Sequence, residues 1–435
     1  MKLSDLSRSF IAPTLIVGAV AIAALIPHGK ELLTTNGSYP AVVCPGALAG
    51  STEQITLPAN NLLVRTISTK STVHKGKKLV ILSGSSLPIF VSGNPGSEVS
   101  FQSISGSNIA AAVCEVGSSD QWFIGGSAGV TSQSILEIVN SGLSDSTVQI
   151  FPFNSKLALA PISITVKANT DRQLKLAAIV PGDESVALHI VSASGRVTSF
   201  LLDHRKSGLK DLGSSFVFPV DAPTRTSYIA GLYASASKAI STMRFLVPGN
   251  LKANVHLTIY SGDGMFTPIG FDSLSVMHQK VVDLPLPKLA LSGGYGIEIS
   301  SDQPILAAAL TRISSGGGDI AWANQLTPIS RFKVNLGGRH GSFFFIGKSL
   351  ALNAQWQDSK GETQKILITG NSSALWSPID PLGVITFTPL TKVPMYGGAI
   401  ISSSTGGLSY LPLLSNVLIS GAHKPTADIR TLARH

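Results

Sequence analysis

An internal repeat constrains this chain more than any other feature, because each copy of a repeated strand pattern must fold and pack in the same way. Four segments recur in the same order: WFIGG (122–126), LEIVNSG (136–142), VQIFPF (148–153) and FLLDHR (200–205) return as YIAGL (228–232), MRFLVPG (243–249), VHLTIY (255–260) and AALTR (308–312). Identical residues match at one constant offset: Gly142 with Gly249, Val148 with Val255, and Arg205 with Arg312. The chain is therefore predicted to contain tandem copies of one module.

Within the repeated segments, apolar and polar residues alternate as they do in half-buried strands. In LEIVNSG, Leu136 and Ile138 share one face and Glu137 takes the other. Period-two alternation with one apolar face indicates antiparallel sheets, each covered on one side. Modules of this length, about 100 residues, predict immunoglobulin-like β-sandwiches. A β-propeller is the alternative, but its blades of about 40–45 residues are shorter than these units.

The segment SSDQPILAAAL (300–310) is interpreted as the closing strand of a module. It has echoes at SGSNIAAAVC (105–114) and SASGRVTSFLL (192–202). A more degenerate copy is predicted to open at FFFIG (343–347). The expected order is a cytoplasmic N-terminus (1–9), an anchor or signal (10–27), a linker (28–40), a short β unit (41–117), three β-sandwich modules (118–212, 222–316 and the degenerate 330–420) in a row, and a basic tail (421–435).

The N-terminal segment is the one stretch that does not read as β-structure. Residues 10–27 carry no charge and follow Lys2 and Arg8. An uncharged stretch of 18 residues is near the minimum for crossing a bilayer, and basic residues before it favour a cytoplasmic N-terminus. We therefore expect a single-pass membrane protein with extracytoplasmic modules. A cleaved signal peptide with the site Ala21-Ile22-Ala23 is one alternative, and a buried soluble helix is another.

The net charge of +9 comes from 33 basic and 24 acidic residues that are scattered along the chain. A nucleic-acid-binding protein would concentrate basic residues and interleave aromatic ones, so no nucleic-acid partner is predicted. An exported basic surface is attracted to anionic polymers or headgroups. The predicted partners are the membrane, through the N-terminal helix, and anionic cell-wall polymers or envelope proteins.

Several motifs resemble those of bacterial exported proteins with tandem modules. WFIGG stands where those modules open with Trp-aromatic-Ala-Glu-Gly, KANTDR (167–172) resembles an Ala-Asn-Ser-Arg turn, and SSDQPILAAA (300–309) resembles Ser-Ser-Asp-Gln-Pro-Ile-Val-Ala-Glu. The layout is similar to a membrane-anchored actinobacterial family of unknown function built from such immunoglobulin-like modules. In that family a Cys-Pro-Gly near the anchor and a second Cys before the first Trp module recur, as Cys44-Pro45-Gly46 and Cys114 do here. The resemblance implies location and fold, and implies no activity.

Cys44 and Cys114 are the only two cysteines of the chain. An even number of cysteines in an oxidising compartment favours pairing. Cys44 opens the first exported unit and Cys114 closes it, and the first and last strands of a sandwich can lie together. We predict a structural disulfide between them, against the alternative of two buried free thiols.

Motifs for chemistry are weak in this sequence. GGSAG (125–129) fits the nucleophile-elbow pattern with Ser127, but that motif requires a strand followed by a helix. The sequence holds no metal-binding motif such as C-x-x-C or H-E-x-x-H, so no metal, cofactor or catalytic residue is predicted. Trp122, Tyr228 and Phe343 open their modules and are expected in core packing or in packing at the junctions between modules. Trp356 and Trp376 are the candidates for stacking on a ligand.

These observations predict a non-enzymatic, extracytoplasmic envelope protein that acts as a scaffold or binding module. Its predicted contacts are cell-wall polymer or another envelope protein. The alternative is an envelope hydrolase with its site at a module junction near Ser127.

Overall fold

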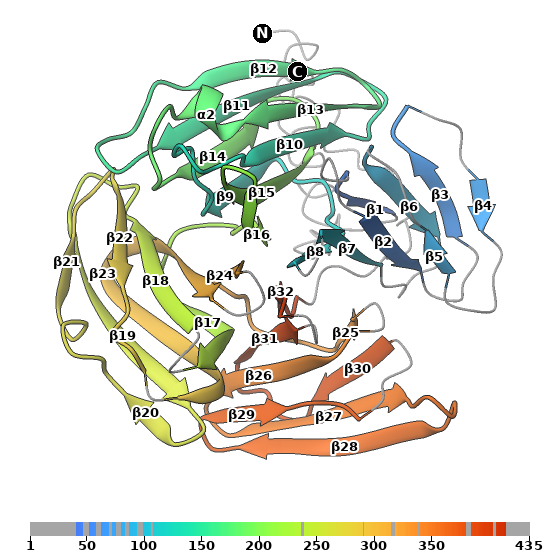
Figure 1. Ribbon diagram of the computed structural model, residues 1–435, viewed down its shortest axis with the longest axis vertical. Coiled ribbons are helices and arrows are strands. Elements are labelled where there is room, and N and C mark those ends of the chain that lie inside the picture. Colours follow the sequence, from blue (N-terminus) through green and yellow to red (C-terminus); the bar gives the residue numbers. More distant parts are fainter. Residues whose placement is uncertain are drawn as a thin grey trace, which may run out of the picture. The chain divides into compact units, whose positions relative to one another are not determined.

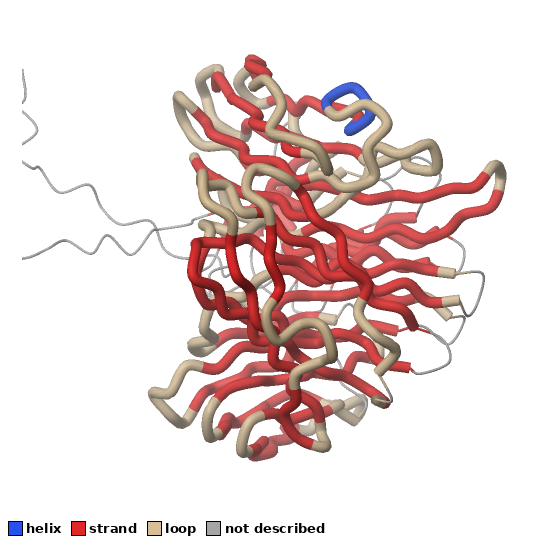
Figure 2. Tube along the Cα trace, turned by 90° about the vertical axis from the view of Figure 1, so that its left-hand side faces the viewer, coloured by secondary structure: helices blue, strands red, loops and turns tan. Residues whose placement is uncertain are grey.

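The computed structural model describes residues 41–46, 52–57, 62–68, 72–74, 80–82, 87–93, 99–105, 108–235, 239–289, 291–314, 318–336, 339–379, 384–402 and 406–414. All of them belong to one compact unit, Tyr39–His435, which is distinct from Met1–Ser38. Their regular structure is β-strand except for one helical turn, α2 (Leu176–Ile179) (Figure 2). The predicted anchor at 10–27 lies outside these residues. No helix among the described residues has the length and apolar character needed to cross a membrane.

The described strands fall into four successive repeats of eight (Figure 1). Repeat 1 consists of β1 (Ala41–Cys44), β2 (Thr52–Leu57), β3 (Leu62–Thr66), β4 (Thr72–His74), β5 (Val80–Leu82), β6 (Ile89–Gly93), β7 (Ser100–Ser105) and β8 (Asn108–Val113). Repeat 2 consists of β9 (Asp120–Ile124), β10 (Ile135–Asn140), β11 (Ser146–Phe153), β12 (Ile162–Val166), β13 (Thr170–Lys175), β14 (Ala187–Ser192), β15 (Thr198–Ser207) and β16 (Lys210–Val217).

Repeats 3 and 4 follow the same plan. Repeat 3 consists of β17 (Thr224–Ser235), β18 (Ala239–Leu246), β19 (Ala253–Ser261), β20 (Gly264–Phe266), β21 (Leu274–Val276), β22 (Val281–Pro285), β23 (Ser292–Ile313) and β24 (Asp319–Asn324). Repeat 4 consists of β25 (Phe332–Asn335), β26 (Gly341–Gly347), β27 (Leu350–Gln357), β28 (Thr363–Gly370), β29 (Ser373–Trp376), β30 (Val384–Pro389), β31 (Met395–Ser402) and β32 (Leu408–Pro412).

Each repeat forms two antiparallel sheets, and the strand order is the same in repeats 1, 2 and 4. Sheet A has the order fourth, third, sixth, first, and sheet B has the order fifth, second, seventh, eighth. In immunoglobulin domains the first two strands are neighbours in one sheet, whereas here they lie in different sheets. The prediction of repeated all-β modules is confirmed, and the strand order differs from that of the constant-type immunoglobulin domain.

In repeat 3 the sixth and seventh strands are fused into β23, which passes from one sheet to the other. Its first half pairs with β17 and β19 of sheet A, and its second half pairs with β18 and β24 of sheet B. The change of partners falls within SSDQPIL, and Pro304 has no N–H to donate to a ladder. The segment 300–310 is therefore a crossover into a seventh strand, and β24 closes the repeat.

Two expected equivalences need correction. IAAAV (109–113) lies in the eighth strand of repeat 1, whereas its sequence echo ILAAAL (305–310) belongs to a seventh strand. FFFIG lies in β26, the second strand of repeat 4, so Phe343 does not open that repeat. Short apolar runs look alike wherever they occur, and only the pairing distinguishes them.

The four eighth strands lie together and close a cycle of contacts between the repeats. β8 contacts β16 and β32, and β24 also contacts both of them. Repeat 1 thus contacts repeat 4 as well as repeat 2, and the expectation of a simple row of modules is wrong. Small residues such as Ala111, Ser215 and Ser409 permit this close approach. Side chains also bond to backbone groups on the unpaired edges of the eighth strands. For example, Ala111 N on β8 donates to Ser409 Oγ on β32 at 2.8 Å.

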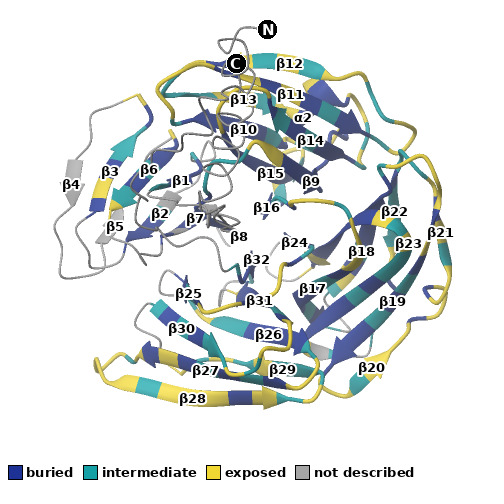
Figure 3. Cartoon of the chain, turned by 180° about the vertical axis from the view of Figure 1, so that it is seen from behind, coloured by how far each residue is buried: buried dark blue, intermediate teal, exposed yellow. Residues whose placement is uncertain are grey.

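A sheet that lies between two neighbouring repeats is covered by side chains on both of its faces. The alternation of apolar and polar residues predicts that only one face is covered. In β15, Leu201 packs into the core of repeat 2, while Phe200 and Leu202 pack into the core shared with repeat 1. There Phe101 meets Phe216 edge-on at 5.8 Å. Figure 3 shows β15 mostly buried, whereas β28, at a sheet edge of repeat 4, is largely exposed.

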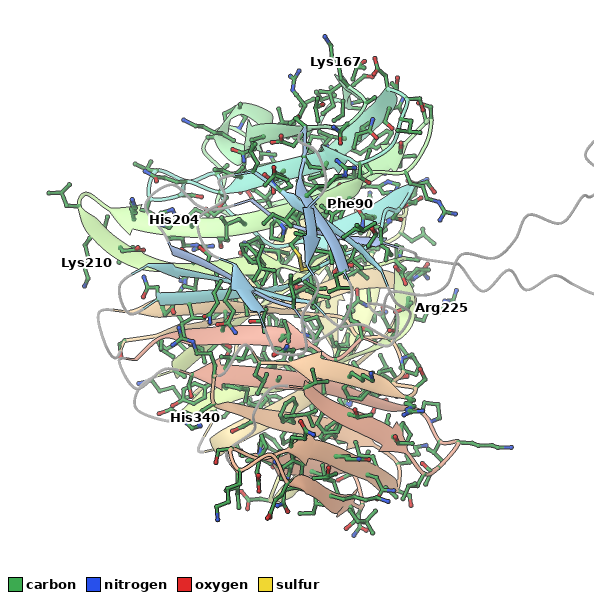
Figure 4. The ribbon with its side chains drawn as sticks, turned by 90° about the vertical axis from the view of Figure 1, so that its right-hand side faces the viewer. Phe90, Lys167, His204, Lys210, Arg225 and His340 are labelled. Atoms are coloured by element: carbon green, nitrogen blue, oxygen red, sulfur yellow. A yellow bond between two sulfur atoms is a disulfide. The ribbon has the colours of Figure 1, made fainter. Side chains whose placement is uncertain are left out.

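The predicted disulfide between Cys44 and Cys114 is present, with a Cα–Cα distance of 4.3 Å (Figure 4). Cys44 ends β1 in sheet A, and Cys114 directly follows β8 in sheet B. The bond therefore joins the two sheets of repeat 1 where its first strand meets the segment after its eighth. Val43 and Glu115 exchange two backbone hydrogen bonds of 2.8 Å beside it.

Reducing this disulfide should lower the free energy of unfolding by roughly 2–4 kcal/mol, because the unfolded chain regains the freedom of a long loop. Chemical unfolding with and without reductant measures the shift. The double variant Cys44→Ser/Cys114→Ser should start at the lower midpoint and show no response to reductant. An unchanged midpoint in protein whose two thiols have been shown to be free would contradict the prediction.

Candidate functional site

A cleft of about 580 Å³ lies where segments of all four repeats meet. Its walls come from the segments that follow the eighth strands and from the starts of the next first strands. Backbone hydrogen bonds hold these segments in place: Val43 with Glu115, Trp122 with Val220, and Leu326 with Tyr228. The cleft is thus a product of the repeat junctions.

Three of the polar side chains that line the cleft are buried and incompletely bonded. Glu115, Gln121 and Ser227 are 8%, 6% and 4% exposed. Within the described part of the chain, Glu115 Oε1, Gln121 Oε1 and Ser227 Oγ have no hydrogen-bond partner. Buried polar groups in folded proteins are nearly always bonded. The three side chains thus place buried polar groups beside the cleft.

Glu115 gives the cleft an unusual charge balance. Burial, together with the negative charge of Asp221, raises the pKa of Glu115 to about 8. Asp221 is exposed and also lines the cleft, as does the exposed Arg196. At neutral pH Glu115 is therefore mostly protonated. A bound positive group would favour its ionised form.

Two stacked tyrosines line another part of the cleft. The rings of Tyr228 (β17) and Tyr396 (β31) lie 4.0 Å apart at an angle of 18°. Burial and the neighbouring Glu298 raise the pKa of Tyr228 to about 12. Glu298 also accepts a hydrogen bond from Tyr260. Both tyrosines therefore remain neutral at physiological pH, and each covers one face of the other's ring.

Ser127 lies elsewhere, in the buried loop between β9 and β10. Its Oγ accepts a hydrogen bond from Gly129 N at 3.2 Å. The motif is followed by the strand β10 and not by the helix that a nucleophile elbow requires. Asp203, in the same region, is bonded to Ser134 Oγ at 2.8 Å and to Arg205. These contacts hold the loop in place.

Trp356 and Trp376 lie in the aromatic core of repeat 4. Their rings are 5.2 Å apart, and Trp376 also contacts Phe343 and Phe387. Trp356 is 8% exposed and donates through Nε1 to Ile379 O at 3.2 Å. The predicted role in ligand stacking places these rings at the surface, whereas the structure covers Trp356 with protein. Their observed contacts are those of core residues.

The sequence alone did not identify the residues of the cleft. Glu115, Gln121, Asp221 and Tyr396 are isolated in the chain and form no motif. Among the described residues, no group of three or more His, Cys, Asp and Glu side chains is placed to hold a metal ion.

Comparison with solved structures finds a similarity to a chain described as the "tetra-tandem repeat in extending region of large adhesion protein". The two chains are 12% identical, the match covers 86% of this chain and 99% of that one, and the TM-score is 0.12. A score this low supports no inference about arrangement or function. A search of characterised proteins found no match. Residues 92–367, more than half of the chain, match a family described as "Family of unknown function (DUF5719)". The chain therefore belongs to the DUF5719 family.

Proposed function

We propose that this protein is a non-enzymatic binding protein of the cell envelope and that the cleft between the repeats receives its ligand. The proposal rests on the cleft itself, which segments of all four repeats form and which both polar and apolar side chains line. Their ligand would be cell-wall polymer or another envelope protein. The four repeats, taken as sandwiches related to the immunoglobulin type, would act as the scaffold that brings the walls of the cleft together.

The disulfide supports a location outside the cytoplasm. Disulfides persist in oxidising compartments and are rare in the reducing cytosol, and Cys44 and Cys114 are joined. Together with the uncharged segment 10–27 behind Lys2 and Arg8, this favours a protein anchored by its N-terminus with the repeats outside the membrane.

Blocking the cleft tests the proposal. Thr226 is exposed and lines the cleft, so Thr226→Trp should fill it without disturbing the core. The full chain should co-sediment with isolated envelope fragments, and Thr226→Trp should reduce the bound fraction at least tenfold. Thr147→Trp, at an exposed position on β11, is the matched control and should bind like the unmodified protein. Failure of the unmodified chain to sediment, or equal binding by Thr226→Trp, would overturn the proposal.

A second candidate, an envelope hydrolase, is favoured by one observation. Glycoside hydrolysis uses a carboxylic acid of raised pKa beside a second carboxylate, and Glu115 and Asp221 share the cleft. The same incubation distinguishes the two functions. A hydrolase would release soluble fragments in a time-dependent manner and would lose this activity in Glu115→Gln, whereas a binding protein would leave the fragments intact.

A further inference from the structure

The outer edge of repeat 4 carries a long strand with a neighbour on one side only. β28 pairs in continuous register with β27 along all eight of its residues and with no other strand among those described. In an antiparallel pair alternate residues bond to the neighbouring strand, and the others direct their N–H and C=O groups away from it. β28 therefore presents a row of open backbone groups at the rim of the molecule (Figure 3).

Other outer edges are protected in ways that β28 is not. The fourth strands of the other repeats are short, since β4 and β20 have three residues each and β12 has five. β13, an edge strand of six residues, carries Asp171, Arg172 and Lys175. Short length and charged residues are common means by which proteins stop an edge strand from pairing with another chain. β28 is longer, has neither proline nor bulge, and contains a single charge, Lys365.

The middle of this edge is apolar and exposed. Ile366 and Leu367 are 41% and 55% exposed. Ile366 pairs with the buried Ala354 and shares the inner face of the sheet with the buried Ile368, whereas Leu367 lies on the outer face beside Asn353. A further strand beside β28 would cover both exposed side chains and bond to the open backbone groups. The edge thus has the properties of a surface for strand addition.

A second copy of this chain supplies a strand that matches this edge. If two β28 strands pair antiparallel about a twofold axis at Leu367, each leucine faces its counterpart, and Ile366 faces Ile368 of the other copy. Lys365 then faces Thr369, so no like charges lie opposite each other. A twofold axis at Ile366 would instead place Lys365 opposite Leu367. The axis at Leu367 therefore keeps apolar residues together, and one contact covers the open edges of both copies.

We propose that the protein self-associates as an antiparallel dimer through β28, with the twofold axis at Leu367. The four strands of sheet A in repeat 4 would then continue into the same four strands of the other copy. No residue of β28 lines the cleft, so this inference is independent of the proposed ligand binding and adds a second interaction surface to the protein.

Sedimentation velocity of the full chain in a mild detergent, over a dilution series, measures the dimer. The unmodified chain should dissociate reversibly on dilution. Leu367→Lys places two like charges opposite each other and should weaken dimerisation about tenfold or more. Thr165→Lys, at an exposed position on the edge strand β12, is the matched control and should dimerise like the unmodified chain. Unfolding midpoints close to that of the unmodified chain show that both variants are folded.

Two exposed threonines of β28 test the register of the pairing. Thr369→Glu places a carboxylate opposite Lys365 of the other copy and should strengthen dimerisation severalfold, because opposite charges across an antiparallel pair attract. Thr363→Glu adds the same charge to the same strand but faces Asn371, so it should not strengthen dimerisation. Equal effects of the two substitutions would contradict the axis at Leu367.

A covalent link identifies the partner directly. The two natural cysteines are joined to each other, so Leu367→Cys adds the one free thiol of the chain. The two Cα atoms at position 367 would lie about 4.5–5.5 Å apart across the dimer, within the usual range for a disulfide. This variant should form a covalent dimer on mild oxidation, and Thr363→Cys should form much less of it.

Three results would overturn the inference. The unmodified chain would sediment as a monomer at every concentration if the edge had no partner of its own kind. A dimer that is unaffected by Leu367→Lys would place the contact elsewhere on the molecule. A link from the Leu367→Cys variant to another envelope protein, in place of a second copy, would assign the edge to a different partner.

Discussion

Replacing Arg244 with methionine should lower the free energy of unfolding by about 3–5 kcal/mol, the usual cost of breaking a buried ion pair. Arg244 is 2% exposed on β18 of repeat 3. Its Nε and Nη2 donate to the two carboxylate oxygens of Asp283 at 2.7 Å. Its Nη groups also donate to the carbonyls of Gly126, Glu184 and Val186 in repeat 2, at 2.6–3.1 Å.

This single guanidinium therefore joins two repeats and also lies 4.8 Å from the Trp322 ring. Methionine preserves much of the packing but leaves Asp283 and the carbonyls without their donor. Denaturant unfolding followed by tryptophan fluorescence measures the loss, and Arg225→Met at an exposed position is the control. The double variant Arg244→Met/Asp283→Leu should recover part of the stability. A decrease in the free energy of unfolding of less than about 1 kcal/mol in the single variant would contradict the prediction, because that is the contribution of a solvent-exposed ion pair.

The repeat could be predicted from the sequence because it depends on local alternation. Leu136 and Ile138 identify a strand and its buried face wherever they occur. The closed cycle of repeats could not be predicted, because Phe200 and Leu202 face a neighbouring repeat where the pattern alone suggests a partly exposed face. For the same reason Glu137, which the alternation places opposite the apolar face, is buried, and so is the charged Arg244. Their partners, Gly46 and Gly126 among them, lie about a hundred residues away along the chain.

The residues of the candidate site could not be predicted from the sequence for a related reason. Its residues are spread over segments of all four repeats, so they form no short motif. Glu115 follows a strand of repeat 1, Asp221 follows one of repeat 2, and Tyr396 lies on β31 of repeat 4. The cysteine pair was predictable because both residues belong to one repeat and cysteine has few structural roles outside the cytoplasm.

Asp319, at the start of β24, occupies the point where the four repeats meet. Its Oδ2 accepts from Leu408 N at 2.9 Å and from Ile109 N at 3.2 Å. Its Oδ1 accepts from Ser214 N at 3.2 Å and from Ile320 N at 2.9 Å. One carboxyl group thus binds the backbone of β8, β16 and β32 as well as its own strand. No other side chain in the described residues is shown to bond to all three neighbouring repeats.

Asp319→Ala should therefore lower the free energy of unfolding by about 3 kcal/mol or more, because each buried N–H group left without a partner destabilises the fold by about 1–3 kcal/mol. The loss should depend on pH. Burial raises the pKa of Asp319 from 3.8 to about 7, although its backbone bonds act in the opposite direction. The folded chain then holds this proton more tightly than the unfolded chain, so the contribution of Asp319 is full below pH 4 and declines as the pH rises to 7.

The variant should consequently lose more stability at pH 5 than at pH 8, as measured by denaturant midpoints at the two values. Asp263→Ala, at an exposed position, controls for removing a carboxylate and should stay within about 0.5 kcal/mol at both. An equal loss at the two pH values would mean that the four N–H groups keep Asp319 ionised in spite of its burial. A loss no larger than that of the control would mean that packing of the small residues on the eighth strands closes the cycle without this carboxylate.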